Sequence, residues 1–174
     1  MIVRASAGKG YRTPNVYADN LGLFVSAKKL VMLEKIQLEE AWNAGLNFTT
    51  RFRWWRREGS LMLDAYHTMF VNQWITDQYS SAEEVYFYNL RGNSSANSVQ
   101  ATFTYEPLLN FTVKLAWRTD DVRTDYLVLK DVNKSLVARN KALANFAWRD
   151  FSEKWKFDAT LQWEWPKNLP MTSG

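Results

Sequence analysis

Long stretches of the chain alternate between apolar and polar residues, which is the period of a β-strand with two different faces. The clearest case is "AWNAGLNFTTRFRWW", residues 41–55. Its apolar parity begins at Trp42 and ends at Trp54, whereas its polar parity carries Asn43 and Arg51. A strand that lines an ordinary protein core has no reason to place its largest rings at both ends. The stretch therefore predicts a strand whose apolar face has two aromatic boundaries.

The same alternation recurs along the chain and predicts about seven strands. They lie at about 2–10, 41–55 and 60–76, and in "NSVQATFTYE", "PLLNFTVKLAWRT", "NKALANFAWRDF" and "KWKFDATLQWEW". The third changes its apolar face partway, which predicts a bulge or an exit from the apolar layer. A shorter strand is predicted over 85–90, and a short helix in "KLVMLEKIQLEEAW", residues 29–42.

Short and long connections between these strands alternate. Tight turns are predicted at "RREG", "EPLLN" and "FSEK", whereas the connections near 11–40, 77–84 and 119–139 are long. A meander with all of its long loops at one end has this arrangement, and outer-membrane barrels are built in this way. A Greek-key sandwich would mix the lengths at both ends. We therefore expect an all-β, antiparallel up-and-down meander.

The distribution of charge over the two parities predicts which face meets which solvent. Burying many Arg and Lys side chains in a protein core is costly, whereas a wall that lines water carries them easily. Indole rings are favourable at the boundary between lipid and water. We expect these residues to face lipid: Trp42, Leu46, Phe48, Phe52, Trp54, Phe111, Val113, Leu115, Trp117, Phe157, Leu161 and Trp163. We expect these residues to face an aqueous lumen: Arg51, Arg53, Lys114 and Arg118.

Composition narrows the functions without identifying one. The 174 residues suit one domain, and 47% of them are hydrophobic. The chain has no cysteine and only one histidine, His67, so we expect no metal site, no cofactor and no enzymatic activity. The net charge of +4 is compatible with nucleic acid. However, the aromatic residues alternate away from the cations, so no nucleic-acid partner is expected.

A second interpretation of the same pattern is a soluble β-barrel or sandwich that binds a ligand or carbohydrate. It predicts that the tryptophan-bearing faces converge on one dry core. No apolar run reaches the roughly 20 residues of a membrane helix, and no export signal is visible. The membrane interpretation therefore expects the chain to be part of a longer precursor.

Several segments resemble the barrel of TonB-dependent outer-membrane receptors. They are "RASAGKGYRTPN", "LEEAWNAGLNFT", "SLMLDAYHTMFVNQWITD", "YNLRGNSSANSVQ" and "FDATLQWEWPKNLP", and they span nearly the whole chain in the family's order. The resemblance implies a location in the Gram-negative outer membrane and import of a bulky nutrient such as a ferric siderophore, cobalamin or haem. It also implies three further partners: the rest of the barrel, a plug domain, and the TonB complex that acts through the plug.

The chain departs from the full family pattern because it shows no plug, no TonB box and no terminal strand ending in an aromatic residue. The family's barrel has about 22 strands, so residues 1–174 are expected to form an internal segment of it. Seven strands cannot close such a barrel. We therefore expect a partial transmembrane β-barrel, an open curved sheet with two unpaired edges.

The resemblance also implies candidate substrate contacts in the outer loops and at the rim. They are Tyr11, Arg12, Asn15, Tyr17, Tyr79, Tyr86 and Tyr88. Aromatic and Arg side chains bind an anionic iron chelate by stacking and by charge-assisted hydrogen bonds. The alternative for each of them is a role in the aromatic boundary or in loop packing.

Overall fold

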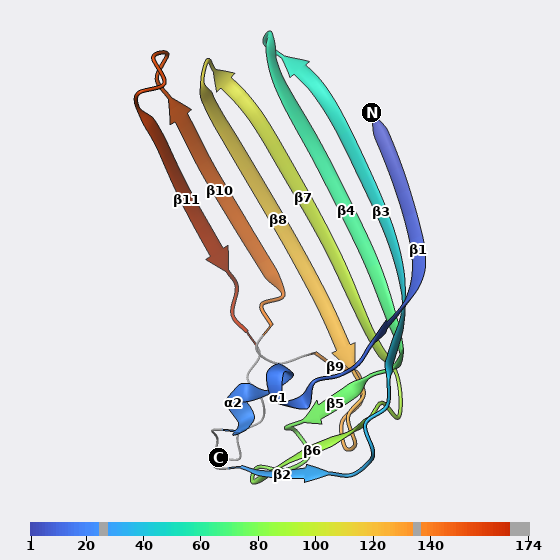
Figure 1. Ribbon diagram of the computed structural model, residues 1–174. Helices are drawn as coiled ribbons and strands as arrows, with labels where there is room; N and C mark the ends of the chain where they lie inside the picture. The colour runs from blue at the N-terminus through green and yellow to red at the C-terminus, as the bar shows by residue number, and fades with distance from the viewer. Residues whose placement is uncertain (25–27, 134–136, 168–174) are drawn as a thin grey trace.

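The structure is a computed structural model that describes residues 1–24, 28–133 and 137–167. Its main feature is a long antiparallel sheet (Figure 1). Seven strands follow one another in the order β1 (Ile2–Arg12), β3 (Glu39–Trp54), β4 (Arg57–Asn72), β7 (Ser94–Leu108), β8 (Phe111–Thr124), β10 (Asn140–Arg149) and β11 (Lys156–Glu164). β1 and β11 are the two edges, and the sheet is not closed. The predicted open up-and-down meander is confirmed.

The two ends of the sheet differ in the way that the long and short connections predict. Tight turns lie at one end, called the turn end, and the long connections gather at the other, called the loop end (Figure 1). The long connections hold short elements: α1 (Val16–Asp19), α2 (Leu21–Phe24), β2 (Lys29–Met32), β5 (Trp74–Asp77), β6 (Glu84–Asn89) and β9 (Val132–Asn133). Together they form what we call the cap. Within it, β2, β6 and β5 make a second, three-stranded sheet.

Two sequence predictions at the loop end are wrong. The helix predicted within 29–42 does not form: Lys29–Met32 is strand β2, paired in parallel with β6, and Glu39 already begins β3. The strand predicted over 60–76 is two strands, because β4 ends at Asn72 and β5 belongs to the cap sheet. Long-range pairing has overridden the local helical pattern. The strand expected over 85–90 is confirmed as β6, which lies in the cap.

The turn end is closed by compact turns whose backbones adopt left-handed conformations. The β3–β4 turn has positive φ at Trp55 (48°) and Arg56 (63°), as a two-residue type I′ turn requires. Asn110 (φ 61°) closes β7–β8. In the β10–β11 turn, the Asp150 amide donates to the Trp155 carbonyl at 2.9 Å. All three predicted tight turns are present, with the first centred just before "RREG".

The buried apolar side chains of the described residues lie at the loop end. Trp74 stacks on Phe87 with ring centroids 5.8 Å apart, and Val85 completes this cluster. Ile75, Tyr88 and Tyr126 form a second one. No second layer covers either face of the long sheet in the described residues, so the cap is the only part of them with a dry interior.

Candidate functional site

Strand register places the predicted lipid-facing residues on a single face of the long sheet. One row of paired residues runs from Phe48 through Leu63, Ala101 and Trp117 to Ala142 and Trp163. Residues that pair directly in antiparallel strands point to the same side. By the same pairings, Trp42, Leu46, Phe52, Trp54, Phe111, Val113, Leu115, Phe157 and Leu161 also lie on this side. Contact with lipid itself stays a prediction.

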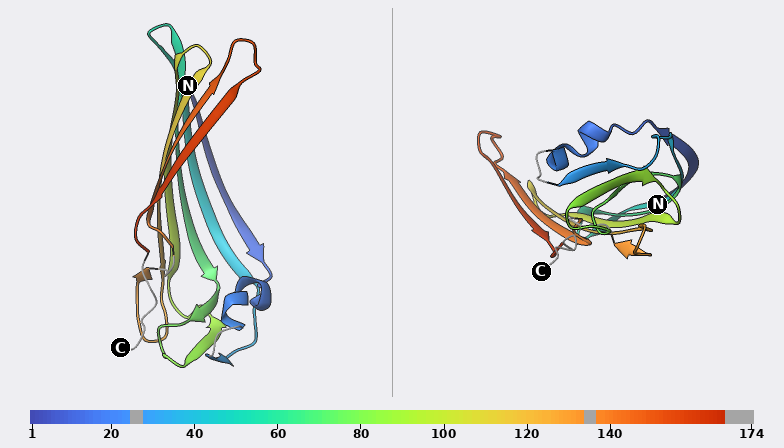
Figure 2. Two further views of the ribbon diagram at one scale, coloured as in Figure 1. Left: turned by 90° about the vertical axis from the view of Figure 1, so that its left-hand side faces the viewer. Right: turned by 90° about the horizontal axis from the view of Figure 1, so that it is seen from below.

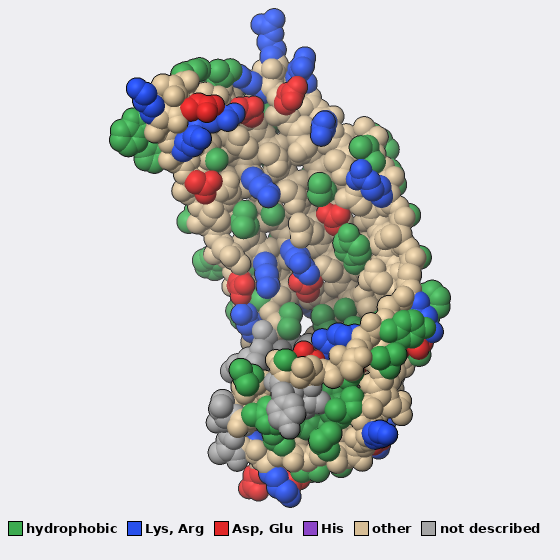
Figure 3. Space-filling view, in the orientation of Figure 1, with side chains coloured by type: hydrophobic (Ala, Val, Ile, Leu, Met, Phe, Trp, Pro, Cys, Tyr) green, Lys and Arg blue, Asp and Glu red, His purple; other side chains and the backbone are tan. Residues whose placement is uncertain are grey.

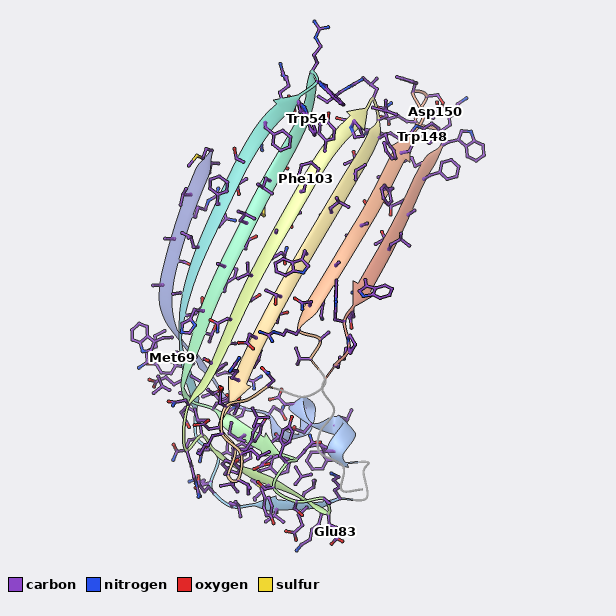
Figure 4. The ribbon with its side chains drawn as sticks, turned by 180° about the vertical axis from the view of Figure 1, so that it is seen from behind. Trp54, Met69, Glu83, Phe103, Trp148 and Asp150 are labelled. Atoms are coloured by element: carbon purple, nitrogen blue, oxygen red, sulfur yellow. The ribbon has the colours of Figure 1, made fainter. Side chains whose placement is uncertain are left out.

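This apolar face is the convex side of a curved sheet. The view from below shows the strands arching around the cap (Figure 2). Seen from behind, Trp54, Met69, Phe103 and Trp148 stand out from the sheet (Figure 4). Leu46, in the middle of β3, is 52% exposed. A broad apolar surface, which none of the described residues covers with a second layer, therefore extends across the strands; such a surface is unusual in single-chain soluble proteins.

The apolar face ends in aromatic clusters near the turn end. The ring of Phe52 lies 5.8 Å from that of Phe103, and the ring of Trp54 lies 5.9 Å from that of Tyr105. Gly59 pairs with Phe52 on one side and with Tyr105 on the other, and a Cβ added to it would lie 2.5 Å from the Phe52 ring. The glycine therefore leaves room for the rings to lean across the strand.

One row of the same face, near the loop end, carries polar side chains. The row that follows Ala44 contains His67, Asn97 and Asp121. The Nδ1 of His67 and the Oδ1 of Asn97 lie 2.7 Å apart, within hydrogen-bonding distance. His67, whose face the sequence left undecided, thus lies on the convex side, in the row next to that of Trp42 and Met69.

The concave face carries the charged and amide side chains. Figure 3 shows Lys, Arg, Asp and Glu scattered over it. Cross-strand hydrogen bonds connect its amides: Asn47 Nδ2 donates to Asp64 Oδ1 at 2.6 Å, and Asn43 Nδ2 donates to Thr68 Oγ1 at 2.7 Å. The predicted lumen residues Arg51, Arg53, Lys114 and Arg118 lie on this side. These charged side chains thus gather on this face as the parity predicts, although Met62 and Tyr66 also lie on it.

Of the residues predicted to contact substrate near β1, Arg12 joins the cap to the sheet. Arg12 Nε donates to Glu39 Oε2 at 2.5 Å, and its guanidinium lies 3.1 Å from Asp19 Oδ2. Asn15 Oδ1 accepts from the Ala18 amide at 3.1 Å and caps α1. Tyr11 is exposed near the loop end of β1. Tyr17 belongs to α1, and its side chain lies outside the described part of the structure.

The three predicted tyrosines of the second long loop come together in the cap. Tyr79 packs against Tyr126 with ring centroids 4.7 Å apart, and the Tyr86 hydroxyl donates to Glu84 Oε2 at 2.7 Å. Tyr88 is 1% exposed, and its hydroxyl donates to Asp77 Oδ2 at 3.0 Å. Burial raises the pKa of Tyr88 and raises that of Tyr126 to about 12. Tyr88 therefore packs inside the cap, whereas Tyr79 and Tyr86 are half-buried.

Asp77, which sequence reasoning missed, organises the cap from its interior. It is fully buried, and its carboxylate accepts from the amides of Tyr79 and Ser80 and from the Tyr88 hydroxyl. An Asp that accepts from amides two and three residues ahead is a local turn signal, visible in "TDQYSS". Only the fold shows that Leu127 of the next long loop also donates to it, at 3.4 Å.

A hollow of about 350 Å³ opens beside this cluster, between β5 and the loop end of β8. Its wall includes Asp19, Asn20, Trp74, Tyr79 and Tyr126, and therefore combines aromatic rings with hydrogen-bonding groups and one carboxylate. Of the predicted substrate contacts, Tyr79 lines it. Such a wall suits a polar solute with apolar faces.

Comparison with family models, curated proteins and solved structures finds no match. The candidate site is therefore interpreted from its own geometry. Among the described residues, no three His, Asp or Glu side chains gather in a way that would hold a metal ion. None of the helices in the described ranges has the length and hydropathy to cross a bilayer.

Proposed function

We propose that the chain is a barrel segment of an outer-membrane receptor of the TonB-dependent type, with its convex face in lipid and its concave face lining an aqueous lumen. The observation that carries this proposal is the uncovered apolar face, continuous in register across the strands and bounded by aromatic rings at the turn end. The hydrocarbon of a bilayer solvates such a face, whereas water does not.

The position of the cap supports a receptor rather than a bare structural wall. The long connections, the aromatic cluster and the hollow beside Tyr79 lie together at one end of the sheet. In outer-membrane barrels the long loops face the exterior and the short turns face the periplasm. In this proposal the cap meets a bulky nutrient such as a ferric siderophore, cobalamin or haem. The rest of the barrel, its plug and the TonB complex complete the transporter.

The soluble alternative requires an arrangement that the described residues do not have. A sandwich or closed soluble barrel buries its tryptophan-bearing faces against one another. Trp42 and Trp163 are instead far from buried and lie on the same side of one open sheet. The membrane proposal is therefore favoured over a soluble ligand-binding domain.

Single-cysteine labelling tests the proposal directly, because the chain has no cysteine of its own. Cysteines are introduced in adjacent pairs, Leu46→Cys with Asn47→Cys and Leu161→Cys with Gln162→Cys, and are labelled with an environment-sensitive fluorophore. After reconstitution into lipid vesicles, doxyl-labelled lipids are expected to quench the labels at 46 and 161. Iodide in the aqueous phase is expected to quench those at 47 and 162.

The adjacent partner in each pair is the matched control, because it lies in the same strand at nearly the same depth and differs only in face. Equal iodide quenching within every pair would contradict the proposal. So would recovery of the folded chain in the aqueous fraction, away from the vesicles.

A further inference from the structure

The ion pairing of Lys and Arg side chains differs between the loop end of the sheet and the tip of the β3–β4 hairpin. At the loop end, cations are paired with nearby carboxylates. The pairs are Lys9–Glu40 at 2.5 Å, Arg12–Glu39 at 2.5 Å, Lys29–Glu84 at 2.8 Å, Arg123–Asp131 at 2.6 Å, and Arg91–Glu34. These five cations are therefore neutralised by carboxylates of the described residues.

The tip of the β3–β4 hairpin, at the turn end, lacks this neutralisation. Its sequence from Arg51 to Glu58 is "RFRWWRRE", with four arginines and one glutamate. Arg53 approaches Glu58 at 3.4 Å. In the part of the chain that the structure describes, Arg51, Arg56 and Arg57 have no carboxylate within ion-pair distance. The tip therefore presents a net positive charge that the chain leaves uncompensated.

Two indole rings share this tip. Trp54 is 53% exposed and Trp55 is 80% exposed, with their ring centroids 5.2 Å apart. Trp55 and Arg56 are the two residues of the turn, where the regular alternation of the strand stops. Arg57 pairs directly with Trp54 across the hairpin, so these two side chains point to the same side. We call Trp54, Trp55, Arg56 and Arg57 the Arg–Trp tip; Arg51 and Arg53 lie beside it on the concave face. Cations and rings that the strand separates are here on one exposed surface.

We propose that the Arg–Trp tip docks on anionic phospholipid headgroups of the leaflet at the turn end of the sheet. The inference rests on the proposed function, since it needs the convex face to lie in the same bilayer. Indoles are favourable at headgroup depth, and a guanidinium binds a phosphate through two parallel hydrogen bonds. A leaflet of anionic lipid attracts each nearby basic residue. Headgroups supply many phosphates at the depth where the apolar face ends.

The test compares reconstitution of the full 174-residue chain into vesicles of phosphatidylcholine alone and of phosphatidylcholine mixed with phosphatidylglycerol. The unmodified chain is expected to partition more strongly into the mixed vesicles, and added salt is expected to weaken this preference by screening. In the Arg56→Gln/Arg57→Gln variant the preference is expected to fall by about fivefold for each arginine removed.

The matched control is Lys29→Gln/Lys130→Gln, which removes two positive charges from the loop end, where both side chains have carboxylate partners. This control is expected to keep the preference for anionic vesicles. An equal loss in both variants would overturn the proposal, because net charge rather than the tip would then explain the preference. Equal partitioning of the unmodified chain into the two kinds of vesicle would also overturn it.

The labelling experiment separates failure of this inference from failure of the proposed function. If the labels at 46 and 161 are quenched by lipid in both kinds of vesicle and no anionic preference appears, the barrel proposal stands and the headgroup site is refuted. If these labels stay aqueous in both kinds of vesicle, the proposed function fails, and with it the inference.

Discussion

Individual side chains in the long strands are distinguished mainly by the face on which they stand. Leu46 and Asn47 are neighbours in β3, yet Leu46 projects from the convex side whereas Asn47 hydrogen-bonds to Asp64 on the concave side. Because the side-chain period of a strand is two, one residue of displacement exchanges the two environments. In the proposed function, the cost of a substitution therefore depends on parity far more than on position along the strand.

A pair of arginine substitutions in β3 tests this dependence. Leu46→Arg is expected to destabilise the sheet in lipid by about 2–4 kcal/mol, because a guanidinium near the middle of the apolar face has to leave water. Thr49→Arg, on the concave face, is expected to be tolerated. Urea titration of the reconstituted chain, followed by tryptophan fluorescence, measures the free energy of unfolding of both variants. Equal destabilisation by the two substitutions would refute the face assignment.

The β3–β4 turn has a backbone conformation that its two central residues do not favour. A type I′ turn favours Asn and Gly because both of its central residues take positive φ. Here Trp55 and Arg56 occupy these positions with φ of 48° and 63°. Left-handed backbone costs roughly 1–2 kcal/mol per residue for ordinary side chains. The hairpin thus accepts backbone strain while presenting an indole and a guanidinium at its tip.

Replacing the two turn residues by favourable ones should stabilise the hairpin. Trp55→Asn/Arg56→Gly is expected to raise the free energy of unfolding by about 1–2 kcal/mol, because the new residues adopt positive φ readily. Chemical denaturation in a zwitterionic detergent measures this free energy of unfolding without a contribution from lipid charge. The control variant is Trp155→Asn/Lys156→Gly, at another turn-end hairpin. Neither residue has a positive φ there, so this variant should not raise the free energy of unfolding. A loss of stability in the first variant would show that the exposed indole contributes more than the strain costs.

At the scale of the whole molecule, an open sheet is combined with a compact cap. Every neighbouring pair among the seven long strands is antiparallel, so β1 and β11 run in the same direction. They therefore cannot pair with each other in an antiparallel manner. Closure into an antiparallel barrel needs an odd number of further strands between these edges. This agrees with the proposal that the chain is one part of a larger barrel.

The cap is held to the sheet and to itself by carboxylates, which makes its stability dependent on pH. Hydrogen bonds from Arg91 and Asn89 lower the pKa of Glu34, and the amides of Asn93 and Asp131 lower the pKa of Asp125. A lowered pKa in the folded state contributes stability above the unfolded pKa, and this contribution is lost as pH falls through the folded value. The cap should therefore loosen below about pH 4.

Limited proteolysis with an acid-active protease, or amide hydrogen exchange, measures this loosening between about pH 6 and pH 3. Cleavage and exchange are expected to rise first in the cap and later in β3, β4 and β7. In Glu34→Gln the acid dependence should be weaker, because one of the lowered carboxyls no longer titrates. Loosening of the cap on raising the pH from 5 to 8 would contradict the assignment.

The alternation of residues was sufficient to predict the long strands, their two faces and the positions of the tight turns. These features follow from local geometry, because a strand's side chains alternate whatever lies beside it. Trp42 and Leu46 could thus be placed on one face, and Arg51 and Lys114 on the other, without coordinates. The open edges could be predicted as well, because about seven strands are too few for the barrel that the sequence resembles.

The cap required the three-dimensional structure. Residues 29–32 and 84–89 are strands because they pair with each other in parallel, although more than fifty residues separate them. Likewise, Tyr88 is buried and Asp77 accepts hydrogen bonds from two loops because segments distant in the sequence meet at one end of the sheet. Periodicity records which face of an element a residue occupies. Which element covers that face depends on long-range packing, which no local pattern contains.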